Sequence, residues 1–139
     1  MNTKKFGDSG EAFAAEYLAG KGFSILERNY RTPMGEIDLI ARDGRVLVFI
    51  EVKTRKTERY GRPALAVGLE KQRRIIRAAV WYTSKRQGEL PTCRFDVVEV
   101  YTPMGGVWSI RGTRIVGGKG LIEKIGGVSW ATMKTDIYA

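Results

Sequence analysis

The spacing of hydrophobic residues along the chain predicts an ordered series of helices and strands. Apolar residues recur at helical intervals over residues 8–19, with Ser9 and Gly20 typical of the start and the end of a helix. Residues 23–30 alternate as a strand does, and a turn follows at residues 33–35. The pattern therefore predicts a helix that leads into the first strand of a sheet.

Two strongly apolar runs, residues 36–41 and 46–53, predict a hairpin in the middle of this half of the chain. An Asp-Gly pair at residues 43–44 separates them and favours the tight turn that joins antiparallel strands. With this pair as the loop, we expect Asp38 to lie opposite Phe49. Because the runs are apolar on both faces, we expect them inside a sheet that helices cover on each side.

The second half of the chain begins with a long amphipathic helix predicted over residues 65–85, with basic residues outside its apolar stripe. Residues 94–101 predict a strand, which a right-handed crossover would place parallel to an earlier one. From residue 102 on, glycines interrupt every apolar run, with an edge strand expected at residues 107–110. Residues 102–139 are interpreted as an extension that is partly disordered, swapped onto a second subunit, or shifted from its ancestral frame.

The composition indicates a basic globular domain. The 139 residues suffice for one domain with a core, and 24 Lys and Arg against 15 Asp and Glu give a net charge of +9. This excess favours a polyanionic partner, nucleic acid before an anionic membrane, with a merely soluble basic protein as the alternative. No apolar run suits a membrane span, no signal-peptide core is present, and the single Cys93 fits a reducing compartment, so we expect a cytoplasmic protein without membrane association.

The sequence contains no histidine. This excludes Ser-His-Asp and Cys-His catalysis and every zinc site that needs a histidine ligand. If the chain hydrolyses a substrate, the available groups are carboxylates, a divalent cation and lysine.

Acidic side chains interrupt the apolar hairpin at one end. Glu36, Asp38, Glu51 and Lys53 are expected on one face of the sheet because side chains alternate along a strand. Asp38 and Glu51 would be diagonal neighbours, roughly 7–8 Å apart at Cα, which lets two carboxylates hold one ion. Clustered acids destabilise a sheet unless something neutralises them, and their oxygens suit Mg²⁺ or Mn²⁺.

Asp38 followed by Glu51-Val52-Lys53 resembles the PD-(D/E)xK nuclease signature in its Asp…Glu-x-Lys form. The wider runs at residues 35–40 and 49–55 closely resemble the YraN family, an uncharacterised bacterial family with the restriction-endonuclease-like fold that is similar to archaeal Holliday-junction resolvases. The resemblance implies an α/β fold with an αβββαβ core, in which helices flank a mixed central sheet. It also implies a nuclease-like domain over residues 1–101.

The resemblance assigns roles to individual residues. Asp38, Glu51 and Lys53 are expected to be catalytic, with Lys53 positioning the attacking water or accepting its proton. The metal ligands expected for Mg²⁺ or Mn²⁺ are Asp38, Glu51, the carbonyl of Val52, Glu11 and Glu36. The alternative for Glu11 is a glutamate that complements the dipole of its helix.

Basic residues near this site, and one glutamine that the resemblance adds, are expected to hold the phosphodiester backbone without reading sequence. The residues expected to do so are Arg55, Lys56, Arg59, Arg62, Lys71, Gln72 and Arg74. Gln72 is equally compatible with a hydrogen bond to a loop carbonyl. Resolvases act as dimers because a four-way junction needs two cuts, so the resemblance also implies a homodimer.

Taken together, these features predict a metal-dependent endonuclease that selects DNA by structure, such as a junction or a flap. Two alternatives stay open. The first is a non-catalytic nucleic-acid-binding module on the same fold. The second is a basic scaffold or assembly factor.

Overall fold

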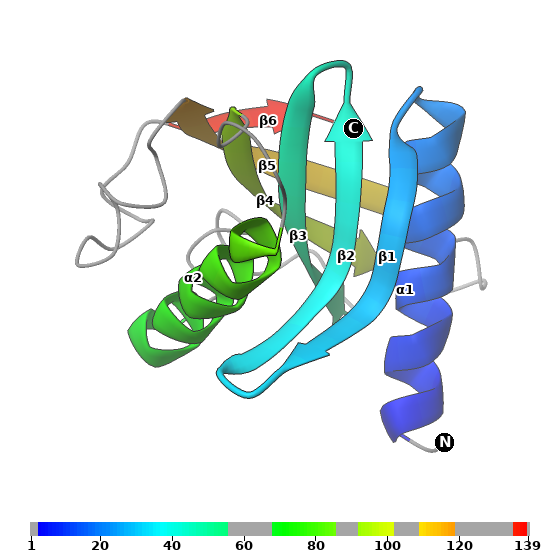
Figure 1. Ribbon diagram of the computed structural model, residues 1–139. Helices are drawn as coiled ribbons and strands as arrows, with labels where there is room; N and C mark the ends of the chain where they lie inside the picture. Colours follow the sequence, from blue (N-terminus) through cyan, green and yellow to red (C-terminus); the bar gives the residue numbers. More distant parts are fainter. Residues whose placement is uncertain (1–2, 56–67, 86–91, 102–108, 119–134, 139) are drawn as a thin grey trace.

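The computed structural model describes residues 3–55, 68–85, 92–101, 109–118 and 135–138 (Figure 1). The elements follow the order α1 (Thr3–Gly20), β1 (Ser24–Thr32), β2 (Gly35–Asp43), β3 (Val46–Arg55), α2 (Leu69–Ser84), β4 (Cys93–Tyr101), β5 (Ser109–Gly118) and β6 (Thr135–Tyr138). The part from α1 to β4 has the αβββαβ order of the restriction-endonuclease-like fold, so the predicted fold class is confirmed. No helix in the described ranges is long and apolar enough to cross a membrane.

The described strands form one mixed sheet in which the spatial order follows the chain order. β3 and β4 pair in parallel, and the other neighbouring strands pair antiparallel. Between β3 and β4 the chain crosses over through α2, as the sequence predicted. Figure 1 shows α1 and α2 on opposite faces of the sheet, which buries both faces of its central strands.

The β2–β3 hairpin has a different register from the one expected. Asp43 pairs with Val46, which makes Gly44 and Arg45 the loop, so the prediction of an Asp-Gly loop was wrong. Gly44 has a φ of 62°, a left-handed conformation that glycine adopts without steric cost. Asp43 stays in the strand because its carboxylate accepts a hydrogen bond of 3.1 Å from Arg94 on β4.

Cross-strand partners are consequently displaced by two residues, and Phe49 pairs with Ile40 and not with Asp38. A displacement by an even number leaves every side chain on its expected face, because faces alternate along a strand. From Leu39 on, the apolar side chains of both strands lie on the faces predicted, whereas Ile37 packs under α2 and not with Leu39 under α1, so the alternation of β2 breaks between Ile37 and Leu39.

Two buried clusters hold the layers together. The cluster between α1 and the sheet consists of Ala14, Ala15, Leu18, Phe23, Leu39, Ala41, Val48, Ile50, Val52, Val98 and Val100. The cluster between α2 and the sheet consists of Ile37, Ile40, Leu47, Phe49, Ile75, Ile76, Ala78, Ala79, Cys93, Phe95 and Val97. The unbroken apolar runs of β3 and β4 thus supply both cores at once, as expected for strands covered on two sides.

The helix α1 approaches β3 closely at Gly10, which is buried. A β-carbon at Gly10 would overlap the side-chain hydroxyl of Thr54. The absence of a side chain at Gly10 therefore lets α1 lie against the end of β3 that carries Lys53.

The glycine-rich extension contributes to the same sheet in its described part. β5 pairs antiparallel with β4, and β6 pairs antiparallel with β5. Of the edge strand expected at residues 107–110, the described part belongs to the start of β5, and β6 pairs with β5 further along, from Gly112 to Ile115.

Candidate functional site

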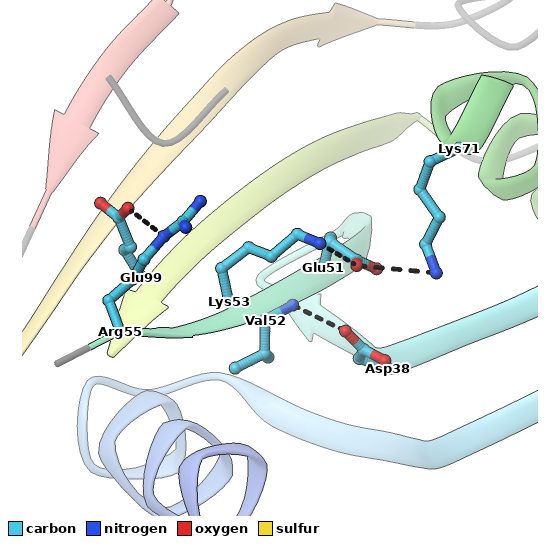
Figure 2. Close-up of polar contacts among 7 residues, drawn as sticks. All are labelled: Asp38, Glu51, Val52, Lys53, Arg55, Lys71 and Glu99. Atoms are coloured by element: carbon cyan, nitrogen blue, oxygen red, sulfur yellow. Dashed lines mark hydrogen bonds and ion pairs between the residues drawn. The ribbon is translucent and has the colours of Figure 1, made fainter. Parts of the chain in front are cut away.

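Asp38 on β2 and Glu51 on β3 come together on adjacent strands (Figure 2). Leu39 pairs with Ile50, so the two acids are the next residues along their strands and not the diagonal neighbours expected. The Asp38 carboxylate accepts a hydrogen bond of 2.8 Å from the backbone N–H of Val52, which fixes its orientation beside Glu51. The structure therefore brings together the two carboxylates predicted as metal ligands.

Glu51 is an acid in an environment that disfavours its charge. Its side chain is 4% exposed, and its Oε2 atom has no hydrogen-bond partner among the described residues. Burial and then the carboxylate of Asp38 raise the pKa of Glu51 to about 8, against the opposing effect of Lys71 and Lys53. Two ionised carboxylates repel each other, so a proton shared by the pair relieves the repulsion. Near neutral pH the pair holds that proton unless a cation replaces it.

Two ammonium groups flank Glu51. The Nζ atom of Lys53 lies 3.7 Å from Oε1 of Glu51, and the Nζ atom of Lys71 lies 3.8 Å from the same oxygen (Figure 2). Lys53 shares the face of Glu51 because it is two residues further along β3. Lys71 reaches over from the start of α2. Both distances exceed a hydrogen bond and both lysines are partly exposed, so either ammonium group is able to turn toward a substrate.

The acid pair has the chemistry that a divalent cation requires. A buried carboxylate oxygen without a partner costs free energy, and an ion placed between the two acids would supply the missing partner. Mg²⁺ and Mn²⁺ prefer such oxygen ligands. Among the described residues, no group of three or more Asp, Glu, His or Cys side chains suited to a metal occurs. The ligand set that the described side chains offer is therefore Asp38 and Glu51.

The further ligands predicted, Glu11 and Glu36, line a different site. They border a hollow of about 570 Å³ between α1 and the β1–β2 hairpin, which we call the α1 hollow. Neither Asp38 nor Glu51 borders it. The structure thus separates these glutamates from the acid pair, because β2 carries Glu36 towards the hairpin turn, where it pairs with Arg31 of β1.

Arg55, predicted to contact nucleic acid, is held by a buried acid. Its Nε donates to Oε1 of Glu99 at 3.1 Å (Figure 2). The hydroxyl of Tyr101 donates to Oε2 of Glu99 at 2.9 Å. Glu99 is 1% exposed and lies opposite Lys53 in the β3–β4 register. This ion pair was not predicted from the sequence. The sequence did contain a signal, because Glu99 and Tyr101 are polar residues two positions apart in an otherwise apolar strand. That Arg55 pairs with Glu99 depends on the parallel register of β3 and β4, which the sequence pattern does not give.

The start of α2 places its three predicted residues differently. Lys71 reaches Glu51, whereas Gln72 is buried in the helix–sheet interface. Arg74 forms an exposed ion pair of 3.4 Å with Glu70. Lys71 and Arg74 also border a second hollow, of about 360 Å³, which we call the α2 hollow. The other residues predicted to bind nucleic acid lie outside the described residues: Lys56, Arg59 and Arg62.

Comparison with known proteins places this arrangement in a family. The model of the uncharacterised protein family UPF0102 matches residues 10–100. This chain belongs to the UPF0102 family. The match includes the part of α1 from Gly10 on, the acid pair and nearly all of β4. UPF0102 is the YraN family that the sequence resembles, so the predicted family is confirmed.

Curated relatives support this membership over the same region. The chain is 54% identical to the UPF0102 protein of Symbiobacterium thermophilum over 98 residues, which are 70% of this chain and 83% of that protein. It is 50% identical to the UPF0102 protein of Geotalea daltonii over 102 residues, 73% of this chain and 80% of that protein. It is 44% identical to the UPF0102 protein of Dictyoglomus turgidum over 108 residues, 77% of this chain and 92% of that protein.

Proposed function

We propose that this UPF0102 protein hydrolyses phosphodiester bonds in DNA with a bound Mg²⁺ or Mn²⁺, as an endonuclease that selects its substrate by structure. The observation that carries the proposal is the pair formed by the half-buried Asp38 and the buried Glu51, with two ammonium groups against Glu51. Two acids brought together in a sheet cost stability. A buried acid with a strongly perturbed pKa and specific charge partners is a candidate for a functional site.

When bound, the divalent ion would polarise the scissile phosphate and lower the pKa of a water molecule. Asp38 and Glu51 would hold the ion, with Asp38 kept in orientation by the N–H of Val52. Lys53 would position the attacking water or accept its proton. Lys71, on the opposite side of Glu51, would donate to the phosphate oxygens, as an ammonium group does in charge-assisted hydrogen bonds.

The net charge of +9 supports a polyanionic substrate, and phosphate contacts of this kind carry no sequence information. A preference for DNA structure over DNA sequence is therefore part of the proposal. A homodimer, implied by the resemblance to resolvases, is part of it as well.

The test uses purified protein with Mg²⁺ or Mn²⁺ and labelled branched and flapped DNA. Asp38→Asn and Glu51→Gln keep the size of each side chain and remove its charge. We expect both variants to lose at least about 100-fold in cleavage rate, because each loses a metal ligand. Glu70→Gln is the matched control, since it removes one exposed carboxylate from the first turn of α2, and it should cleave as the wild type does.

Cleavage that survives both acid substitutions would remove the assignment. If the wild-type protein binds DNA in a salt-dependent manner but yields no product, the result would support the alternative of a non-catalytic nucleic-acid-binding module. Weak DNA binding without products would favour a scaffold.

A further inference from the structure

Two polar hollows lie on either side of the β1–β2 hairpin, and neither supplies a ligand to the proposed metal ion. The α1 hollow, of about 570 Å³, has a polar lining of Glu11, Arg28, Asn29, Arg31 and Glu36. The α2 hollow, of about 360 Å³, is bordered by Arg31, Thr32, Gly35, Glu36, Lys71 and Arg74.

The hollows follow one another along a path that starts at the acid pair. Lys71 borders the α2 hollow and lies 3.8 Å from Glu51. Arg31 and Glu36, which are cross-strand partners, border both hollows. A DNA strand with a phosphate beside Glu51 would therefore meet first the α2 hollow and then the α1 hollow.

The path is narrow where Gly35 of the β1–β2 hairpin approaches Arg74 of α2. A β-carbon at Gly35 would lie 3.2 Å from Cβ of Arg74 and 3.3 Å from its carbonyl oxygen. The hollows have the size of small-ligand pockets, which suits one or a few nucleotides. The bases of a duplex are stacked inside it, whereas an unpaired nucleotide is able to enter a pocket and expose the edge of its base.

The α1 hollow carries the groups that such a nucleotide needs. Arg28 and Arg31 are donors for phosphate oxygens. Asn29 offers an amide, and the carboxylates of Glu11 and Glu36 are acceptors for exocyclic amino groups of bases. Asn29 has a φ of 49° in the middle of β1, a left-handed conformation that non-glycine residues rarely adopt and that is concentrated at functional sites.

We infer that the α1 hollow binds an unpaired nucleotide of the strand whose phosphate lies beside Glu51. Arg28 and Arg31 hold its phosphates, and Asn29 and the two glutamates contact its base. Because carboxylates accept from amino groups, bases that carry one are preferred over thymine. This inference rests on the proposed function and narrows its substrate to DNA with a single-stranded extension.

The test is fluorescence anisotropy without metal, on the full-length protein. The three probes are a blunt duplex, the same duplex with a short adenine tail, and the same duplex with a thymine tail. We expect the wild type to bind the adenine tail about tenfold more tightly than the blunt duplex. Arg28→Ala should remove most of this gain and reduce the salt dependence by about one phosphate contact.

Two further variants make the result specific. Asn29→Gly removes the amide and keeps the left-handed backbone, because glycine adopts it freely, so it should fold and bind both tailed probes more weakly. The preference for adenine over thymine should remain, since the carboxylates of Glu11 and Glu36 that cause it are still present. Arg42→Ala is the matched control, since it removes an equal charge from an exposed position of β2 that borders neither hollow. Circular dichroism verifies that each variant is folded.

Equal affinity for blunt and tailed DNA, or an Arg42→Ala effect as large as that of Arg28→Ala, would overturn the inference. The failure of the proposed hydrolysis looks different. If the protein prefers tailed DNA but never cleaves it, nucleotide binding in the α1 hollow is supported and the proposed hydrolysis is contradicted. If cleavage depends on Asp38 and Glu51 but the tail has no effect on binding or cleavage, the proposed hydrolysis is supported and nucleotide binding in the α1 hollow is contradicted.

Discussion

The Nζ atom of Lys71, at the start of α2, lies 3.8 Å from the Oε1 atom of Glu51 on β3. The contact joins the start of a helix to the buried sheet and, together with Lys53, sets two ammonium groups against one carboxylate. Glu51 therefore sits between groups that favour its charge and surroundings that oppose it. The burial and the neighbouring carboxylate of Asp38 prevail, and the pKa is raised to about 8.

The raised pKa of Glu51 has a consequence for metal binding. A divalent cation must displace the proton that the acid pair holds, so its affinity should rise with pH until the pH reaches about 8. Between about pH 6 and 8, we expect Mn²⁺ affinity to increase by up to about tenfold per pH unit. Isothermal titration calorimetry in buffers of different ionisation enthalpy measures both the affinity and the released proton. An affinity that does not change over this range would contradict the shared proton.

The same pKa predicts how stability depends on pH without metal. Glu51 has a folded pKa of about 8, above its unfolded value of about 4.5, so the folded protein binds more protons between these values. Its contribution to the free energy of unfolding therefore falls as pH rises through this window. Glu51→Gln, which carries no charge, should stabilise the fold by about 1–3 kcal/mol near pH 9 and have little effect near pH 5.

Urea denaturation at the two pH values measures this difference. Glu70→Gln is the control, because Glu70 is an exposed acid, and its effect should be small at both pH values. A Glu51→Gln variant that is less stable than the wild type near pH 9 would show that the ionised carboxylate is well accommodated.

The contact between α1 and β3 at Gly10 predicts a steric effect. Gly10→Ala places a β-carbon against the Thr54 hydroxyl, and we expect it to destabilise the fold by about 1–3 kcal/mol. Gly20→Ala is the control, since open space surrounds that position and alanine is the better helix former. Thermal unfolding of Gly10→Ala combined with Thr54→Ala should recover most of the loss. No recovery in the double variant would place the strain elsewhere.

Arg55 distinguishes a structural role from the predicted contact with nucleic acid. Arg55→Ala removes the ion-pair partner of Glu99, a carboxylate that is almost fully buried, and we expect a loss of about 2–4 kcal/mol in the free energy of unfolding. Combining it with Glu99→Gln should cost less than the sum of the two single changes, because the buried charge is then absent. Denaturant unfolding of this double-mutant cycle measures the coupling. Unchanged stability with weakened DNA binding would instead support the role predicted from sequence.

The central site was predictable because it depends on local rules. Asp38 and Glu51 were placed on one face by the alternation of side chains and on adjacent strands by the hairpin signal. The error in the hairpin register did not affect this prediction, because a displacement of the pairing by two residues does not by itself move side chains to the other face of the sheet. The turn was assigned to residues 43–44 because the contact that keeps Asp43 in the strand comes from Arg94, far along the chain.

The surroundings of the site were less predictable because they depend on how distant elements pack. Glu11 and Glu36 belong to a hollow that forms only when α1 lies against the hairpin. The partner of Glu99 is set by the parallel register of β3 and β4, which no local pattern encodes. Lys71 was named for DNA contact, and its distance to Glu51 depends on where the helix α2 begins.

Anomalous scattering from a crystal soaked in millimolar Mn²⁺ measures most directly whether the acid pair is a metal site. We predict one strong peak about 2.0–2.3 Å from carboxylate oxygens of both Asp38 and Glu51, which disappears in the Asp38→Asn variant. A map without a peak between these side chains, or with a peak that the substitution leaves unchanged, would contradict metal-dependent hydrolysis at this site.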